Sequence, residues 1–351
     1  MALQTFYYPH PFSLESGEQL PELQVAYMTW GTLNPERTNV IWICHALTGS
    51  ADAADWWSGL VGEGKLFDPT HYFIVCANVL GSNYGSTNPL SINPLTGQPY
   101  YHTFPTITIR DIVKSFDLLR EYLTINGIDT CVGGSLGGQQ ALEFAILRPS
   151  LIKKLILMAT NAVMSPWGIA FNESQRMAIA CDPTWKESRS DAGLTGMKTA
   201  RAIALLSYRN YETYALTQQR NREGLKEDFR ASTYQRYQGE KIAQRFNAFS
   251  YNVLTKVMDT HDVSRGRDGI VRTLQQVKAR TLIVAISSDV LFPPAEQQGL
   301  ARYIPGAKYV EINSVYGHDG FLIENEAIKQ AIQSWEAEED VADFSVLVAK
   351  T

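Results

Sequence analysis

Ser135 is the residue whose surroundings in this sequence best suit covalent chemistry. It stands at the centre of Gly-Gly-Ser-Leu-Gly-Gly (133–138), between a short apolar run and an amphipathic stretch. A G-x-S-x-G motif that joins a strand to a helix forms a nucleophile elbow, in which the glycines permit a tight turn that exposes the serine hydroxyl. A glycine-rich turn that only packs closely or binds phosphate is the simpler alternative. The residues further along the chain favour the catalytic interpretation.

A serine nucleophile needs a base and an acid, and with this motif they follow the serine in the order acid, then histidine. Only His261 and His318 lie downstream of Ser135. His318 is the predicted base because it follows a predicted late strand, whereas His261 lies in a polar stretch and is expected to be structural or exposed. Asp289 ends another late strand, 29 residues before His318. That spacing holds one helix and one strand, so Asp289 is the predicted acid that orients the imidazole.

Acyl transfer also needs hydrogen-bond donors for the oxyanion that develops in the transition state. One donor is predicted to be the backbone N–H of Leu136, directly after the nucleophile. The other is predicted in the loop 44–50 after an early strand, with the N–H of Leu47 as first choice and that of Thr48 as second. His45, in the same loop, is expected to brace it by hydrogen bonding rather than to transfer protons.

Six short apolar runs rich in β-branched residues alternate with helical patterns and predict the elements that carry these loops. The predicted strands are 39–44, 71–79, 128–134, 152–160, 279–287 and 307–313, and the predicted helices are 108–123, 137–147, 295–304 and 324–337. Strands this apolar are buried on both faces, which predicts an α/β fold with a mostly parallel, doubly wound sheet. Residues 5–30 alternate apolar and polar around a turn-like segment, which predicts an N-terminal antiparallel hairpin.

The strand pattern stops between about residues 165 and 272, where the chain is polar, helix-prone and rich in Arg, Gln and Tyr. Because strands are predicted on both sides of this stretch, an inserted helical lid fits it better than an independent domain. We therefore expect a core domain of residues 1–164 and 273–351 and a lid of residues 165–272. The tail from about Ala337 is acidic and then apolar, and no structure is predicted for it.

The composition excludes several classes of protein and partner. The 351 residues are 45% hydrophobic and carry a net charge of −5, which is typical of a globular chain and gives no basic surplus for nucleic acid. No apolar run is long enough for a membrane span, and the start lacks the order of a secretory signal, so we expect a cytoplasmic protein with no membrane partner. The four cysteines form no CxxC pair, three of them lie in strand-like apolar runs, and all four are expected to be structural. No histidine spacing indicates a metal site.

Over roughly residues 15–335 the sequence resembles the homoserine O-acetyltransferases, which are acyltransferases of methionine biosynthesis with the α/β-hydrolase fold. The resemblance rests on a series of motifs that occur in the same order. They include HALTGS (45–50), NVLGSNYGSTNPLSINPLTGQPY (78–100), FPTITIRDIV (104–113), GGSLGGQQALEFA (133–145), FNESQRMAIACDPTW (171–185), ARAIALLSYR (200–209), RFNAFSYNVLTKVMDTHD (245–262), SSDVLFPP (287–294) and GHDGFL (317–322). Leu136 stands where the family usually has Met, a change that leaves the backbone N–H unaffected. Asn247 replaces a common Asp.

The resemblance implies a ping-pong reaction in which Ser135 takes an acyl group from acyl-CoA, with acetyl-CoA as the expected donor, and passes it to the hydroxyl of L-homoserine. It also implies that Arg201 and Tyr208 bind the amino-acid carboxylate, that Asp319 binds the ammonium group, and that lid helices form a homodimer. No tightly bound cofactor is expected. The spacing of Arg201 and Tyr208 agrees with a shared task, because seven residues turn a helix by about 700° and place both on one face about 10 Å apart. Without the resemblance, Arg201 would be interpreted as an exposed lid residue.

The sequence leaves three alternatives open. The first is a serine-type carboxylester hydrolase on the same scaffold, since water can deacylate any acyl-serine. The second is a relative that uses succinyl-CoA or serine, and the third is a non-catalytic binding protein of the same fold. A plain hydrolase would not need the charges of Arg201 and Asp319, and a binding protein would not need Ser135 with its glycine flanks. Acyl transfer is therefore favoured, although the fold alone does not decide the activity.

Overall fold

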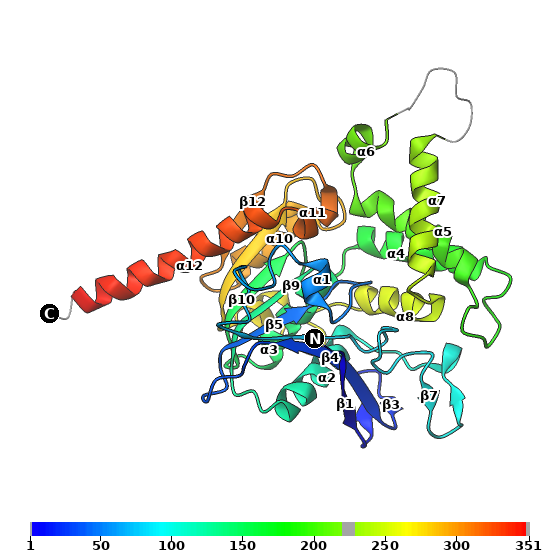
Figure 1. Ribbon diagram of the computed structural model, residues 1–351, viewed down its shortest axis with the longest axis horizontal. Coiled ribbons are helices and arrows are strands. Elements are labelled where there is room, and N and C mark those ends of the chain that lie inside the picture. The colour runs from blue at the N-terminus through cyan, green and yellow to red at the C-terminus, as the bar shows by residue number, and fades with distance from the viewer. Residues whose placement is uncertain (1, 220–228, 349–351) are drawn as a thin grey trace.

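The computed structural model describes residues 2–219 and 229–348, and an eight-stranded sheet lies at its centre (Figure 1). The strand order is β1 (Gln4–Tyr8), β4 (Leu23–Trp30), β6 (Phe73–Ala77), β5 (Val40–Cys44), β9 (Ile128–Gly134), β10 (Ile152–Met158), β11 (Arg280–Ile286) and β12 (Lys308–Ile312). The strands from β6 to β12 in this order run parallel, and β4 and β1 continue the sheet in antiparallel pairing. The predicted mostly parallel sheet is confirmed, and all six predicted strands end within two residues of their predicted limits.

The antiparallel N-terminal hairpin is confirmed as well, with a smaller hairpin inserted in it. β1 pairs with β4 from Gln4 opposite Tyr27 to Tyr8 opposite Leu23. Between them, β2 (Phe12–Ser13) and β3 (Gln19–Leu20) form a second antiparallel pair around the turn that contains Gly17, whose φ is +89°. A further short hairpin, β7 (Ile92–Asn93) with β8 (Gln98–Pro99), lies outside the main sheet.

Both faces of the sheet are buried, because alternate side chains of each strand point to opposite apolar clusters. On β5, Trp42 and Cys44 belong to one cluster, whereas Ile41 and Ile43 belong to the other. The first cluster includes side chains of α2 (Ile109–Tyr122), α3 (Leu136–Leu147) and α10 (Pro294–Tyr303), and the second includes side chains of α1 (Ala53–Trp56) and α12 (Asn325–Val348). The doubly wound arrangement predicted from the strand composition is therefore present.

The chain leaves the sheet after β10 and returns to it at β11. The helices between these strands are α4 (Pro166–Ala180), α5 (Leu194–Tyr208), α6 (Tyr211–Thr217), α7 (Arg230–Ala243), α8 (Ala248–Asp259) and α9 (Ile270–Leu274). Figure 1 shows α4, α5, α7 and α8 gathered on one side of the sheet. We call the helical stretch 165–272 the lid. The division into core and lid domains at these residues stays a prediction, and residues 220–228 of the lid lie outside the described chain.

The C-terminal helix is longer than the sequence pattern predicted. Helix α11 (Gly320–Ile323) is followed by α12, which does not end near residue 337 but continues to Val348 and extends well beyond the sheet (Figure 1). The acidic tail contains no Gly or Pro before residue 348, so nothing in the sequence interrupts the helix. No helix in the described ranges combines the length and the apolar composition that a membrane span requires.

Candidate active site

Ser135 lies on a strained turn between β9 and α3. Its φ of 57° and ψ of −126° are unusual for a residue with a Cβ, as expected at a nucleophile elbow. The flanking glycines are required because the backbone approaches itself closely. A Cβ on Gly133 would lie 2.3 Å from the carbonyl oxygen of Gly137, and one on Gly137 would lie 2.1 Å from that of Cys44. The turn brings the serine side chain to the wall of a cavity of about 200 Å³.

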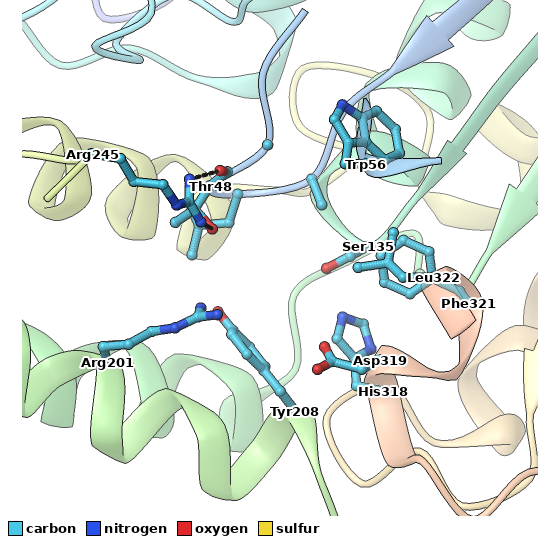
Figure 2. A pocket seen from close by; sticks show the side chains of 13 residues that line it. Thr48, Trp56, Ser135, Arg201, Tyr208, Arg245, His318, Asp319, Phe321 and Leu322 are labelled. Carbon is cyan, nitrogen blue, oxygen red and sulfur yellow. Dashed lines mark hydrogen bonds between the residues drawn. The ribbon is translucent and has the colours of Figure 1, made fainter. Parts of the chain in front are cut away.

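His318 and Asp289 come from loops that follow neighbouring strands of the same sheet. Asp289 lies shortly after β11, and His318 lies in a short 3-10 turn (Gly317–Asp319) after β12. Since β9, β10, β11 and β12 are parallel neighbours, their carboxyl ends bring these loops to one edge of the sheet. His318 lines the same cavity as Ser135, and Figure 2 shows the two side chains facing it together. A hydrogen bond between them is not present among the described residues, and catalytic pairs of this kind often tighten only in the substrate complex.

The acid and the base are fixed by several contacts. Nδ1 of His318 lies 2.7 Å from Oδ2 of Asp289, and the side chains are 4% and 0% exposed. The other oxygen, Oδ1, accepts hydrogen bonds from the backbone N–H groups of Leu291 and Phe292 at 2.8 and 2.9 Å. The imidazole also stacks on the Phe292 ring at 5.2 Å. With Nδ1 directed to the carboxylate, Nε2 remains available to take a proton from a nucleophile.

The loop after β5 forms a turn whose central N–H groups are available as donors. The N–H of Gly49 donates to the carbonyl of Ala46 at 2.9 Å, so Leu47 and Thr48 are the central residues of the turn. Leu136 is the first residue of α3, where an N–H has no intrahelical acceptor. In the described chain, no hydrogen bond uses the backbone N–H of Leu47 or Leu136. Leu47 lines the cavity together with Thr48. That the N–H groups of Leu47 and Leu136 bind the oxyanion stays a prediction.

His45 braces this turn, as its position in the sequence predicted. Its Nδ1 lies 2.8 Å from the carbonyl oxygen of Ala46, and its Nε2 accepts a hydrogen bond from the backbone N–H of Val79 at 3.1 Å. Those two contacts define a neutral ring with its proton on Nδ1. Complete burial lowers the pKa of His45 to about 4, so the ring is neutral near pH 7 and is not a proton carrier.

The three residues predicted to bind the amino acid line the same cavity, two of them on the lid and one beside His318. Arg201 and Tyr208 reach the cavity from α5, and Asp319 reaches it from the turn that holds His318 (Figure 2). The guanidinium carbon of Arg201 lies 5.2 Å from the centroid of the Tyr208 ring. Asp319 pairs with Arg209 at 3.1 Å, and burial raises its pKa despite the two nearby arginines. The structure thus brings these side chains to the same cavity as Ser135.

Arg245 is a cavity residue that the sequence interpretation did not single out. It follows α7 and donates from Nη1 to the carbonyl oxygen of Thr48 at 2.7 Å (Figure 2). These two residues are 197 positions apart, so no local pattern relates them. The available signal was the lid motif RFNAFSY, which begins at Arg245.

The other downstream histidine does not belong to the cavity. His261 is 3% exposed, and its Nε2 lies 3.0 Å from the carbonyl oxygen of Asn161. Burial lowers its pKa to about 4. The predicted structural role of His261 is therefore confirmed, and His318 is the downstream histidine that lines the cavity with Ser135.

The cysteines and acidic residues form no further reactive cluster in the described part of the chain. Cys44, Cys76 and Cys131 are buried in strands as predicted, and Cys181 is exposed at the end of α4. Among the described residues, no group of three or more His, Cys, Asp or Glu side chains is placed to hold a metal ion. The cavity around Ser135 is accordingly the candidate active site.

Comparison with known proteins agrees with this geometry. The family model described as alpha/beta hydrolase fold matches residues 39–324. The homoserine O-acetyltransferase of Cyclobacterium marinum is 50% identical over 95% of this chain and 95% of its own length. That of Chlorobaculum tepidum is 46% identical over 94% of this chain and 93% of its own.

Solved structures agree as well. The homoserine O-acetyltransferase of Bacillus anthracis superposes with a TM-score of 0.88 at 25% identity, over 95% of this chain and 96% of that one. An acetylester hydrolase from Corynebacterium glutamicum shares the fold, with a TM-score of 0.83 at 24% identity over 96% and 95% of the two chains. The fold is therefore shared with an acetyltransferase and a hydrolase alike, and the family is shown by the 50% and 46% identities to the two homoserine O-acetyltransferases over nearly the whole chain. The chain belongs to the homoserine O-acetyltransferase family of α/β-hydrolase-fold enzymes.

Proposed function

We propose that this enzyme transfers an acyl group from acyl-CoA to the hydroxyl of L-homoserine through an acyl-Ser135 intermediate, a step of methionine biosynthesis. One observation carries the proposal. A single cavity is lined by Ser135 and His318. The same cavity offers Arg201 and Tyr208 from the lid and Asp319 beside His318, which together match the carboxylate and ammonium groups of a free amino acid.

In the first half-reaction, the Ser135 hydroxyl attacks the thioester carbonyl while Nε2 of His318 takes its proton. The oxyanion is stabilised by the N–H groups of Leu47 and Leu136, and the imidazolium is stabilised by the Asp289 carboxylate. Collapse of the tetrahedral intermediate breaks the carbon–sulfur bond. The leaving thiolate takes the proton from His318, so that CoA departs as the thiol and Ser135 carries the acyl ester.

In the second half-reaction, the homoserine hydroxyl gives its proton to His318 and attacks the acyl-Ser135 carbonyl. The new ester bond forms on homoserine, and the Ser135 oxygen recovers the proton as it leaves. Arg201 is suited to the acceptor carboxylate because its planar fork can donate two parallel hydrogen bonds. Asp319 follows His318 directly, so an ammonium group held there would lie close to the catalytic base.

Acetyl-CoA is the acyl donor that the cavity supports best. Apolar and aromatic side chains line the cavity together with Ser135, namely Trp56, Phe321 and Leu322. A neutral acetyl group needs no charged partner in such a setting, whereas burying a second carboxylate there would cost free energy. Acetyl-CoA acts here as a substrate, and no tightly bound cofactor is needed for either half-reaction.

The deciding experiment measures thiol release from acetyl-CoA with and without L-homoserine. We expect one burst of CoA per active site without the acceptor and sustained release only with it, accompanied by O-acetylhomoserine. Sustained release at an equal rate without homoserine would identify a hydrolase. Absence of any burst with acetyl-CoA or succinyl-CoA would exclude the acyl-enzyme, and parallel assays with succinyl-CoA and L-serine define donor and acceptor.

We also propose a cytoplasmic homodimer joined through the lid. Large apolar side chains are exposed on lid helices, with Trp167 54% exposed and Met177 60% exposed on α4, and Leu206 55% exposed on α5. Apolar surface of this kind is common where a second subunit binds. Sedimentation of the purified enzyme tests the dimer, and fractionation of cells tests the location.

A further inference from the structure

Arg245 connects the lid to the loop that follows β5. It lies between α7 and α8, and its Nη1 donates to two oxygens, the carbonyl of Thr48 at 2.7 Å and the hydroxyl of Tyr84 at 2.6 Å. Nη2 lies 3.4 Å from Oγ1 of Thr48. Because each terminal guanidinium nitrogen carries two hydrogens, both donors of Nη1 are committed to protein oxygens. Figure 2 shows Arg245 and Thr48 together on the wall of the cavity.

The same region joins three loops through side-chain amides. Asn83 donates from Nδ2 to the backbone carbonyl of Arg245 at 2.9 Å. Asn78 donates from Nδ2 to the carbonyl of Tyr84 at 2.7 Å and accepts at Oδ1 from the N–H of Ala51, also at 2.7 Å. The loop 45–51, the loop 78–88 and the start of α8 are thus held as one unit, and Arg245 closes it on the side of the turn.

We propose that Arg245 is a positioning residue for the oxyanion donors, an inference that rests on the proposed function. Its hydrogen bond draws the carbonyl of Thr48 toward the lid. That carbonyl follows Leu47 by one residue and belongs to the peptide unit whose N–H closes the turn on Ala46. The carbonyl of Ala46 belongs to the same peptide unit as the N–H of Leu47, so the turn hydrogen bond from Gly49 couples that N–H to the peptide plane that Arg245 holds. The lid thereby determines whether the core presents its donor to the cavity.

The guanidinium adds a second, electrostatic contribution. It lines the cavity in which negative charge develops on the thioester oxygen, and a cation held there lowers the energy of that charge. Arg245 differs from Arg201 in this respect. In the described chain Nε of Arg201 is buried without a partner, as suits a group that meets a ligand, whereas Nη1 of Arg245 is already bound to the protein.

The test replaces Arg245 by Met and by Lys and measures acylation of Ser135 with two donors, acetyl-CoA and p-nitrophenyl acetate. For Arg245→Met we expect the acylation rate constant to fall by about 10- to 100-fold with both donors, less than the ~100- to 1,000-fold cost of removing an oxyanion donor outright. The KM for acetyl-CoA and for homoserine should stay nearly unchanged. Arg245→Lys should recover part of the rate, because an ammonium can still donate to the Thr48 carbonyl.

The affinity for a transition-state mimic is a second measurement, and it would not change if Arg245 only stabilised the fold. Methylboronic acid forms a tetrahedral anion on an active-site serine, and its affinity should fall by the same factor as the acylation rate. Two control variants accompany the series. Tyr84→Phe keeps the bond to Thr48 and should change acylation by less than about threefold. Arg272→Met removes an arginine whose side chain is 74% exposed and should change nothing.

The outcomes separate this inference from the proposed function. A wild-type enzyme that is never acylated would overturn both. A wild-type burst combined with unchanged acylation and unchanged boronic-acid affinity in Arg245→Met would overturn only the role of Arg245. A loss confined to acetyl-CoA, with p-nitrophenyl acetate unaffected, would make Arg245 a direct ligand of the CoA donor instead. A lower melting temperature with full activity at 20 °C would make it a structural contact.

Discussion

The residues proposed for catalysis, on the sheet, and Arg201 and Tyr208, proposed for binding on the lid, differ in how fully the protein itself satisfies their hydrogen-bonding groups. Asp289 uses both carboxylate oxygens, one toward His318 and the other toward two backbone N–H groups. Arg201, by contrast, has a buried Nε with no partner in the described chain, and its guanidinium rests on the Tyr208 ring. Buried polar groups are normally paired. The proposed catalytic acid is therefore fully hydrogen-bonded before substrate binds, whereas Arg201 and Tyr208 on α5, which we call the recognition wall, keep hydrogen-bonding capacity for a ligand.

The same contrast extends to backbone strain. The positive φ of Ser135 lies in the core and is over-determined by the packing of Gly133 and Gly137 around it. Arg201 and Tyr208 occupy an ordinary helix, where only side-chain placement serves the site. Changes on the sheet should therefore disable both half-reactions, whereas changes to the polar groups of Arg201 and Tyr208 on the lid helix α5 should affect only the half-reaction that uses homoserine.

Replacing the nucleophile should have the largest effect. Ser135→Ala removes the only atom that can carry the acyl group, so we expect CoA release to fall by more than about 1,000-fold. The fold should persist, because alanine adopts the strained φ no less readily than serine. Stopped-flow thiol detection and the intact mass of the protein measure the acyl-enzyme, and Ser174→Ala, at an exposed serine of α4, is the control. A normal burst would place the nucleophile elsewhere.

Arg201→Met tests the lid side of the contrast. Loss of a charge-assisted hydrogen bond to the acceptor carboxylate, worth ~1.5–3 kcal/mol, should raise the KM for homoserine by about 10- to 100-fold. The CoA burst without homoserine should keep its rate. Arg201→Lys should lie between the two enzymes, since it retains the charge but loses the planar fork. Slower CoA release at an unchanged homoserine KM would remove Arg201 from the recognition wall.

The sequence predicts most of the core, including its strands and the three residues proposed for catalysis. Uninterrupted apolar runs rich in β-branched residues indicate the buried strands, and the elbow at Ser135 is recognised from a local motif. Asp289 and His318 are separated by one helix and one strand, a spacing that parallel topology converts into proximity. These sequence features are local or depend only on the regular connection between neighbouring parallel strands, and the structure agrees with the predictions made from them.

The roles of lid residues are less predictable from the sequence because they depend on packing between segments that are far apart in the chain. Arg201 gained a role only through the resemblance to a family, since its composition and spacing also suit an exposed helix. Arg245 acquires its contact to Thr48 across 197 residues, which no periodicity encodes. Helix α12 is longer than its amphipathic pattern predicts for a different reason, because the acidic stretch after about residue 337 breaks the apolar pattern without containing a residue that ends a helix.

The pH dependence of homoserine binding sharpens the contrast further. Burial raises the pKa of Asp319, with Arg209 and Arg201 opposing the shift, so this carboxyl becomes neutral at a higher pH than an ordinary aspartate. Binding of an ammonium group requires the carboxylate. Affinity should therefore be full above that raised pKa and fall by about tenfold for each pH unit below it.

Calorimetry with the Ser135→Ala variant isolates this binding from catalysis, because the variant cannot turn over. In Ser135→Ala the Kd of homoserine should rise on acidification. In the double variant Ser135→Ala/Asp319→Asn the Kd should be high and nearly constant over the same pH range. A Kd that is independent of pH in the parent variant would show that Asp319 does not meet the ammonium group.

The smallest effect is expected from Tyr208→Phe, which separates recognition from catalysis within one side chain. Burial raises the pKa of Tyr208, so its hydroxyl stays protonated and can donate to the acceptor carboxylate. Removing that donor should raise the homoserine KM by about 3- to 10-fold, the range of one neutral hydrogen bond. The ring remains, and with it the contact to Arg201 at 5.2 Å and the packing against the His318 ring at 5.9 Å. The CoA burst should therefore be unchanged in Tyr208→Phe but slowed in Tyr208→Leu, which lacks the ring. A Phe variant with a normal homoserine KM and a slower burst would assign Tyr208 to the catalytic side of the cavity.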